Sequence, residues 1–335
     1  MINKVYDKVL EYLKANYKFY LILLAVFFIC IIELPFYIEA PGGLIDVNRR
    51  IEVETAKEIE GSFNLPYVLE FRATLPTLIF GHLNRNATVH RKREHIPENE
   101  TIEDIHFRDK LLLEEASDNA IIASFNRANR YVTITNRKVY VIFVDINSNT
   151  DLRIGDQILK INDKYIYSKE DVYSVLREYQ VGDEISFLVY NEGEKTRKAI
   201  MYEDNDRAIV GIALGETKEI DTNEDVKFSF PRSESGPSGG LIIALAIYNH
   251  LIEQDITNGL KIVGTGSIDE NGNIGTVGGI EHKIRTAARR KADLFLIPSG
   301  ENYETARRII NENNFNLKLV SVDTIDKAIE YLLSY

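Results

Sequence analysis

Ser238 stands out in the sequence as a side chain whose neighbours suit acyl-transfer chemistry. It lies in the stretch ESGPSGG (234–240), and the apolar run LIIALAIY follows at once, which predicts a buried helix that begins beside the serine. The N-terminus of a helix offers unpaired backbone N–H groups that can stabilise an oxyanion, and flanking glycines let a substrate backbone come close. Ser238 is therefore a candidate nucleophile, provided that the chain supplies a base.

Three other interpretations of Ser238 stay open on this stretch alone. The serine could be a plain N-cap beside a glycine-rich turn, or it could line a phosphate-binding helix N-terminus, although no lysine is close by in the sequence. GPSGG also fits the G-x-S-x-G motif of α/β-hydrolases, for which Asp269 and His282 would have to act as partners. Too few residues follow Ser238 in this sequence for the rest of that fold, and His250 lies about 18 Å along the same predicted helix.

A lysine base fits the pattern better than a histidine. The segment GGIEHKIRTAARR predicts a helix after Gly279 with Ile280, Ile284 and Ala287 on one apolar face, and Lys283 lies on the flank of that face in the first turn. Burial and the positive end of a helix dipole both lower the pKa of a lysine, and a neutral lysine can accept a serine proton. Taken alone, Lys283 could equally be a surface lysine whose stem packs along the helix, so the prediction rests on the pair.

Together these segments resemble the proteolytic domain of the Lon peptidases. The resemblance is carried by the serine in GPSGG, the segment TGSI (265–268) and the lysine in GGIEHK, and it extends from Ile209 to Leu333. It implies that Ser238 is the nucleophile, that Lys283 is the general base and that Thr265 helps to hold the lysine. Ser235 and Gly236 would support the serine from the preceding turn. The sequence departs from the pattern at Ser235, where an acidic residue is common, and at Gly239, where alanine is common.

Residues 131–203 show a second pattern, which resembles a PDZ domain of the bacterial type. A strand (VYVIFVDI) leads to LRIGDQILKIND, then to a helix with Ser168 as N-cap, and then to a hairpin that turns at residues 191–193. PDZ domains bind extended peptides by strand addition beside that helix. We therefore expect a substrate-binding edge facing residues 170–176, made of Val139, Tyr140, Val141, Ile142 and Phe143. No glycine-rich loop for a terminal carboxylate precedes this edge, which is a departure from the family pattern.

The N-terminal segment predicts a membrane anchor. Residues 19–32 are uncharged and the apolar stretch continues to Ile38, which gives the length of about 20 residues that a transmembrane helix needs. Lysines precede this span and acidic residues follow it, so residues 1–18 are expected in the cytoplasm and the remainder outside. A cleaved signal peptide is the alternative, although Pro41 directly after Ala40 disfavours cleavage there.

Composition excludes several other classes of protein. The net charge of −11 argues against broad nucleic-acid binding, and the single cysteine, Cys30, excludes an internal disulfide. The six histidines show no metal-ligand spacing and no Walker A motif is present, so we expect no metal, no cofactor and no ATP hydrolysis.

The sequence as a whole resembles the membrane-anchored, PDZ-containing Lon-type proteases of Gram-positive bacteria. It predicts an α+β chain with a cytoplasmic segment (1–18), a transmembrane helix (19–38), an extracytoplasmic region of strands and helix (39–130), a PDZ-like β-rich domain (131–203) and a Lon-type proteolytic α/β domain (207–335). The expected activity is ATP-independent endopeptidase cleavage of unfolded or peptide segments of extracytoplasmic proteins. The resemblance also implies a homo-oligomer, since Lon-type domains often assemble into rings. The competing hypotheses are a catalytically inactive PDZ adaptor at the membrane and a serine esterase.

Overall fold

The computed structural model describes residues 2–54, 57–91, 100–231 and 236–335. The chain divides into two compact units, of which the first holds residues 1–42 and 68–97 and the second holds residues 43–67 and 98–335. The class is mixed α+β, as predicted. The predicted domain limits stay predictions.

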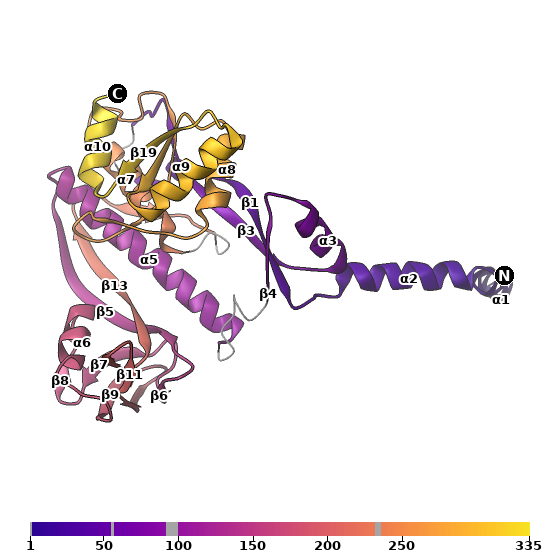
Figure 1. The fold of residues 1–335 in the computed structure, drawn as a ribbon, viewed down its shortest axis with the longest axis horizontal. Coiled ribbons are helices and arrows are strands. Elements are labelled where there is room, and N and C mark those ends of the chain that lie inside the picture. Colours follow the sequence, from indigo (N-terminus) through magenta and orange to yellow (C-terminus); the bar gives the residue numbers. More distant parts are fainter. Residues whose placement is uncertain (1, 55–56, 92–99, 232–235) are drawn as a thin grey trace. The chain divides into compact units, whose positions relative to one another are not determined.

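The first unit contains the apolar N-terminal segment, the strand pair of β1 and β4, and the end of β3, which is the other neighbour of β1 (Figure 1). Its elements are α1 (Ile2–Ala15), α2 (Tyr17–Ile31), α3 (Leu75–Leu83) and β4 (Thr88–Arg91), together with part of β1 (Phe36–Asp46) and of β3 (Ser62–Arg72). Strands β1 and β4 pair antiparallel, from Phe36 opposite Arg91 to Glu39 opposite Thr88.

The prediction of one helix over residues 19–38 is wrong. Helix α2 ends at Ile31, and Phe36 to Ile38 belong to β1, where Tyr37 and Ile38 are buried. Pro35 accounts for the break, because a residue before proline avoids the helical conformation. Leu34 donates its backbone N–H to the carbonyl oxygen of Ala73 instead, at 2.7 Å. Within the described residues, no helix is both long enough and apolar enough to cross a membrane.

A parallel sheet covered by helices on both faces forms the C-terminal part of the second unit. Strands β15 (Lys261–Gly264), β18 (Leu294–Pro298) and β19 (Lys318–Val322) run parallel, and β15 also pairs with β3. Side chains alternate along a strand, so Leu294 and Leu296 of β18 join one apolar cluster while Phe295 and Ile297 join another. The helices of this part are α5 (Ile102–Arg127), α7 (Gly240–Leu251), α8 (Ile280–Arg289), α9 (Glu301–Asn313) and α10 (Ile325–Leu333).

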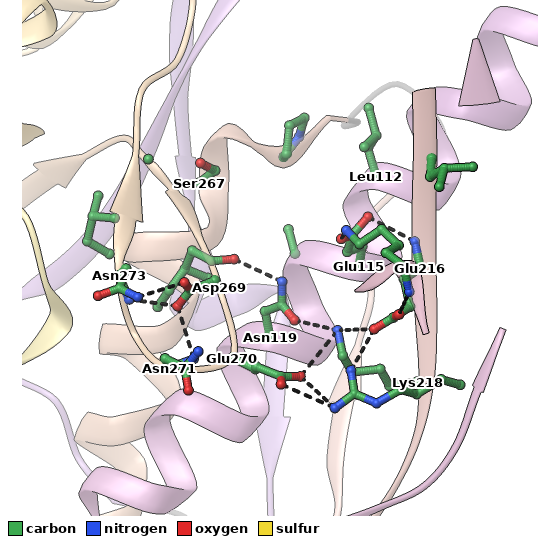
Figure 2. Close-up of a pocket in the computed structure, with 18 of the residues that line it drawn as sticks. Leu112, Glu115, Asn119, Glu216, Lys218, Ser267, Asp269, Glu270, Asn271 and Asn273 are labelled. Atoms are coloured by element: carbon green, nitrogen blue, oxygen red, sulfur yellow. Dashed lines mark hydrogen bonds and ion pairs between the residues drawn. The ribbon is translucent and has the colours of Figure 1, made fainter. Parts of the chain in front are cut away.

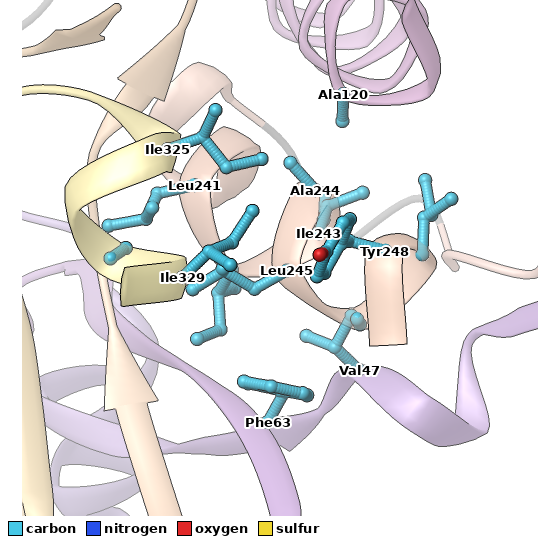
Figure 3. Packing of buried hydrophobic residues seen from close by; sticks show 14 of the residues in the cluster. Val47, Phe63, Ala120, Leu241, Ile243, Ala244, Leu245, Tyr248, Ile325 and Ile329 are labelled. Atoms are coloured by element: carbon cyan, nitrogen blue, oxygen red, sulfur yellow. The ribbon is translucent and has the colours of Figure 1, made fainter. Parts of the chain in front are cut away.

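Helix α7 is the centre of the larger apolar cluster. Every residue from Gly240 to Asn249 is buried, which confirms the prediction of a buried helix after Ser238. Figure 3 shows Leu241, Ala244 and Leu245 among Val47, Phe63, Ala120 of α5, and Ile325 and Ile329 of α10. Because α7 is surrounded on all sides, the turn that precedes it is held in a fixed position.

The part of the second unit that the sequence predicts to be PDZ-like, called the PDZ-like sheet below, is an antiparallel sheet with one short helix. The strand order is β13 (Ile212–Thr222), β5 (Val132–Val144), β7 (Gln157–Ile161), β9 (Glu184–Tyr190), β10 (Glu194–Ile200) and β6 (Asn149–Thr150). Helix α6 (Lys169–Leu176) has Ser168 as N-cap, with the predicted capping box to Asp171, and β9 and β10 form the predicted hairpin. The shorter elements of the second unit are η1 (Val47–Arg49), β2 (Ile51–Val53), β8 (Lys164–Tyr165), β11 (Tyr202–Asp204), β12 (Arg207–Ile209), β14 (Val226–Phe228), η2 (Pro237–Gly239), β16 (Ser267–Ile268) and β17 (Ile274–Gly275).

The predicted peptide-binding edge from Val139 to Phe143 is not an edge. These residues lie in β5, where Val139 and Tyr140 pair with β13 on one side and with β7 on the other. The sequence pattern does not predict this pairing, because β13 follows the hairpin and its partner β5 lies far before it in the sequence. The terminal strands of this sheet are β13, next to β5, and β6 at the other end.

Candidate active site

The turn that carries Ser238 is a short 3₁₀ segment, η2, directly before α7. Gly236 adopts a φ of +95°, a conformation that side chains rarely take. A Cβ on Gly239 would lie 3.0 Å from a methyl group of Leu65, and one on Gly240 would lie 2.7 Å from Ile268. The glycines therefore allow the serine turn to pack closely on its neighbours. The N-cap of α7 is Gly239, so the interpretation of Ser238 as a plain N-cap of this helix is wrong.

Ser238 and Lys283 are connected through Thr265. Thr265 follows β15, is fully buried, and donates its hydroxyl to the carbonyl oxygen of Ser238 at 3.0 Å. The same oxygen of Ser238 accepts the backbone N–H of Gly266 at 2.9 Å. The Thr265 hydroxyl in turn accepts a hydrogen bond from Lys283 Nζ at 3.1 Å. The structure thus brings together three residues that lie up to 45 positions apart in the sequence.

Lys283 is the fourth residue of α8 and is more deeply buried than its place on the flank of the apolar face suggested. Its side chain lies inside the protein, with the residue only 5% exposed. Burial lowers the pKa of Lys283 to about 8, because an ammonium group loses its hydration there. In the described parts of the chain, no carboxylate contributes an attraction that would raise the pKa of Lys283 again. A large fraction of the lysine is therefore neutral at mildly alkaline pH.

The residues that a hydrolase triad would need are used in other ways. Asp269 accepts the backbone N–H groups of Asn271 and Asn273, at 3.0 and 2.8 Å, and so holds the turn between β16 and β17. His250 lies at the far end of α7 from Ser238, as predicted. His282 is buried beside Lys283 on α8. This arrangement does not support a Ser-His-Asp interpretation of Ser238.

The two supporting residues of the serine turn differ in what the structure says of them. Ser235 lies outside the described residues. Gly236 donates its backbone N–H to the carbonyl oxygen of Asp109 on α5, at 3.4 Å. Helix α5 therefore borders the serine turn, which the sequence did not predict.

A polar cavity of about 490 Å³ lies beside the serine turn, in the second unit (Figure 2). Its walls come from α5, the PDZ-like sheet and the β16–β17 turn, and they include Pro237 and Ser267. The residues that line it and carry charge or amides are Glu115, Asn119, Arg137, Lys169, Glu170, Glu216, Lys218, Asp269, Glu270, Asn271 and Asn273.

An ion-pair network crosses this cavity from the PDZ-like sheet to the β16–β17 turn. Arg137 of β5 contacts Glu216 of β13 at 2.6 Å and Glu270 of the turn at 2.9 Å. Lys218 pairs with Glu216 at 3.2 Å and donates to the Asn119 side chain of α5 at 2.8 Å. Burial by itself would raise the pKa of Glu216, but the Lys169 backbone N–H and the charges of Lys218 and Arg137 hold it below its usual value.

No local sequence pattern predicts this network. Its charges belong to strands, a helix and a turn that meet only in the folded chain. Glu270, at which the network ends, lies in the turn after β16 and five positions beyond Thr265 in the sequence.

A second, more apolar cavity of about 490 Å³ lies between α6 and the first residues of β13. Tyr173, Leu176 and Arg177 line it from α6, and Ile212, Ala213 and Leu214 line it from β13. Strand β13 pairs with β5 on one side, and no described strand pairs with its other side. A strand end beside an apolar helix face is the arrangement that strand addition requires.

Comparison with known proteins places the serine turn, Thr265 and Lys283 within one family match. Residues 211–335 match the Lon protease (S16) C-terminal proteolytic domain. The Lon protease of Campylobacter jejuni is 31% identical over 101 residues, which cover 30% of this chain and 12% of that protein. The Lon protease of Phenylobacterium zucineum is 29% identical over 121 residues, which cover 35% of this chain and 15% of that protein. The chain thus matches a small fraction of the length of these relatives.

Among solved structures, the PDZ domain of the SdrC-like protein from Listeria monocytogenes is similar to part of the chain. The identity is 19% and the TM-score is 0.23, with 24% of this chain and 92% of that domain covered. The match to the Lon (S16) domain supports a serine-type peptidase domain at the C-terminus.

Proposed function

We propose that this chain is an ATP-independent serine endopeptidase that uses Ser238 as nucleophile and Lys283 as general base. The observation that carries the proposal is the continuous hydrogen-bonded path from Lys283 through Thr265 to the backbone of Ser238, with the lysine buried and its pKa lowered to about 8. A peptidase of this kind needs a lysine that is neutral near physiological pH, and burial provides it.

The direction of the hydrogen bonds defines the role of Thr265. Its hydroxyl proton is given to the Ser238 carbonyl, so its oxygen is left to accept from Lys283. A neutral lysine that donates one N–H to Thr265 keeps its lone pair to accept the Ser238 proton. Thr265 thereby orients the lysine without taking part in the chemistry.

The reaction follows from these roles. Lys283 accepts the proton as the Ser238 oxygen attacks the scissile carbonyl carbon, and backbone N–H groups at the serine turn stabilise the oxyanion. The protonated lysine then gives its proton to the leaving amine as the peptide C–N bond breaks. A water molecule, deprotonated by the same lysine, hydrolyses the acyl-enzyme and frees Ser238.

The PDZ-like sheet is proposed to select substrates. The proposed binding edge is the start of β13 instead of residues 139–143. There, Ile212 to Leu214 and the α6 residues Tyr173 and Leu176 line the same apolar cavity. Unfolded or peptide segments of proteins would bind there as an added strand. A peptide bound to β13 would then affect the position of the β16–β17 turn, because Arg137 pairs both with Glu216 of β13 and with Glu270 of that turn.

Attachment to a membrane with the catalytic part outside the cytoplasm is the proposed location. Its support is α2, whose large apolar side chains are exposed along the whole helix, and the lysines that precede it in the sequence. The substrates would accordingly be extracytoplasmic proteins. Assembly into a homo-oligomer is part of the same proposal and rests on the resemblance to Lon-type domains.

Incubation with a reduced, unfolded protein tests the proposed activity against its rivals. The full chain should produce peptides that mass spectrometry detects, and Ser238→Ala should produce none while keeping the same melting temperature. An inactive adaptor would bind the unfolded protein without cutting it, and an esterase would turn over small acyl esters only. Equal cleavage by the Ser238→Ala variant would refute the proposal.

A further inference from the structure

Helix α3 exposes an apolar face instead of a polar one. Leu75, Ile79, Phe80 and Leu83 are 43%, 54%, 60% and 79% exposed, and their spacing places them on one side of the helix. The nine residues LPTLIFGHL contain no acidic residue and no lysine or arginine. A helix on the surface of a soluble domain normally turns its polar residues outward.

The opposite side of α3 fixes this orientation. Gly81 is buried, and a Cβ at this position would lie 3.0 Å from Val89 of β4 and 3.3 Å from Ile38 of β1. The helix therefore packs its glycine side tightly on the strand pair. Its large side chains have to point away from it.

The exposed face of α3 is joined to the end of α2 within the same unit. The backbone N–H of Leu34 binds the Ala73 carbonyl at 2.7 Å, and the N–H of Ala73 binds the Phe36 carbonyl at 2.9 Å. Arg72 and Glu33 form an ion pair at 2.7 Å beside these bonds. The chain that leaves α2 and the chain that enters α3 are thus held side by side.

Helix α2 indicates what covers α3. No residue of α2 is buried, and its sequence after Lys18 is apolar all round, which suits hydrocarbon and not water. Its 15 residues rise about 22 Å, whereas a bilayer core is about 30 Å thick. A second apolar element at the end of α2 would extend the contact into the layer where headgroups meet acyl chains.

We propose that α3 lies in the membrane interface, with Leu75, Ile79, Phe80 and Leu83 immersed among the lipid chains. The inference rests on the proposed membrane attachment and adds a second contact to it. An amphipathic helix in this position inserts about 5–10 Å into the boundary layer. Exposed Arg85 just beyond the helix favours anionic headgroups, whereas exposed Glu70 on β3 does not.

The single cysteine provides a test of each contact in the full chain. A polarity-sensitive fluorophore on native Cys30 reports on α2, and the same label on Phe80→Cys in a Cys30→Ser background reports on α3. Tyr167→Cys in that background is the control, because Tyr167 is an exposed aromatic residue of the PDZ-like part. The probe is a vesicle of phosphatidylcholine and phosphatidylglycerol, with lipid-borne quenchers in the interface.

The inference predicts that vesicles shift the emission of the labels at residues 30 and 80 to the blue and that the quenchers reduce both. The label at residue 167 should not respond. If the label at 30 responds and the label at 80 stays in water, the inference is wrong while membrane attachment stands. If neither responds and the chain does not float with vesicles, both are wrong. A blue shift at residue 80 without vesicles, rising with protein concentration, would assign the face to a second copy of the chain and overturn the inference.

A charge substitution gives a second measurement. At lipid concentrations where only part of the chain is bound, Phe80→Glu should lower the vesicle partition coefficient measured by flotation by about tenfold, the effect of withdrawing one large apolar side chain from hydrocarbon. Tyr167→Glu should leave it unchanged. Because Phe80 is exposed, its replacement should also leave the melting temperature in detergent unchanged, and an unchanged partition coefficient for Phe80→Glu would contradict the inference.

Discussion

Lys283 Nζ lies 3.1 Å from the hydroxyl oxygen of Thr265, and both residues are buried. The lysine therefore has one fixed neighbour, whose hydroxyl oxygen accepts its hydrogen bond while the hydroxyl proton is donated to the Ser238 carbonyl. A lysine on a long flexible stem would otherwise sample many positions. This contact links the position of the candidate base to the position of the candidate nucleophile.

Thr265→Val should lower kcat/KM for a short peptide by about 10–100-fold, because the isosteric side chain cannot accept the Lys283 hydrogen bond or donate to Ser238. Thr265→Ser keeps the hydroxyl and should retain most of the activity. Steady-state kinetics on both variants, with melting temperatures as a check on folding, make the comparison. Equal activity of the valine and serine variants would remove Thr265 from the proposed site.

The pH dependence of activity should follow the ionisation of Lys283. Burial lowers its pKa to about 8, so the neutral, proton-accepting form grows as pH rises through that value. The rate on a short peptide should therefore rise across this range and level off above it. A rate that is flat from pH 7 to 9 would argue against a lysine base.

The burial that lowers the pKa of Lys283 and so favours catalysis also lowers the free energy of unfolding. An unfolded lysine holds its proton up to about 10.4, whereas the folded protein releases it near 8. Between these values the unfolded state binds more protons, so the free energy of unfolding rises with pH. Below pH 8 the buried ammonium costs on the order of 3 kcal/mol.

Lys283→Met should remove this cost while keeping much of the packing volume. We expect the inactive variant to be more stable than the parent chain at pH 7 by on the order of 3 kcal/mol, with the difference shrinking toward pH 10. Denaturant unfolding at pH 7 and pH 10 measures both values. A methionine variant that is less stable at pH 7 would show that Lys283 is charged and well compensated.

If the network across the polar cavity couples substrate binding to the active site, its loss should affect cleavage of an unfolded protein more than cleavage of a short peptide. Arg137→Ala removes the contacts to Glu216 and Glu270. We expect kcat/KM for an unfolded protein to fall several-fold, with little change for a short peptide that does not need the PDZ-like sheet. Lys138→Ala is the matched control, because the adjacent Lys138 pairs with Glu219 on the exposed surface. Equal losses on both substrates would assign the network a structural role only.

A charged side chain introduced on α6, across the cavity from β13, tests the proposed binding edge. Tyr173 lines that cavity from α6 and is partly exposed, so Tyr173→Asp should weaken binding of an unfolded protein by about tenfold without unfolding the domain. Tyr190→Asp, at an exposed position of β9, should have no effect. Fluorescence anisotropy with the Ser238→Ala chain measures binding apart from cleavage. Unchanged affinity in Tyr173→Asp would place the substrate elsewhere.

Local sequence patterns predicted the elements around the site. The apolar run after Ser238 predicted α7, the Ser168–Asp171 spacing predicted the cap of α6, and the helical period around Lys283 predicted α8. Each of these signals lies within one or two helical turns, where chain geometry relates spacing directly to a face. The candidate pair of Ser238 and Lys283 came from the same kind of signal.

Features that depend on distant pairing were not predictable in the same way. The continuous apolar stretch through Ile38 concealed the change from helix to strand, because burial in a strand pair and insertion in a bilayer both select apolar residues. The pairing of β13 with β5 and the contact of Arg137 with Glu270 join segments far apart in sequence. Single-sequence periodicity contains no information about such partners.

The most direct test of the Ser-Lys assignment compares two neighbouring residues of α8. Arginine keeps the charge and most of the stem of Lys283 but does not give up its proton in a protein. We predict that Lys283→Arg loses about 10²–10⁴-fold in kcat on a short peptide, as expected for the loss of a general base. His282→Gln should retain most of the activity, with both variants folded by melting temperature. Activity that survives in Lys283→Arg and disappears in His282→Gln would contradict the assignment.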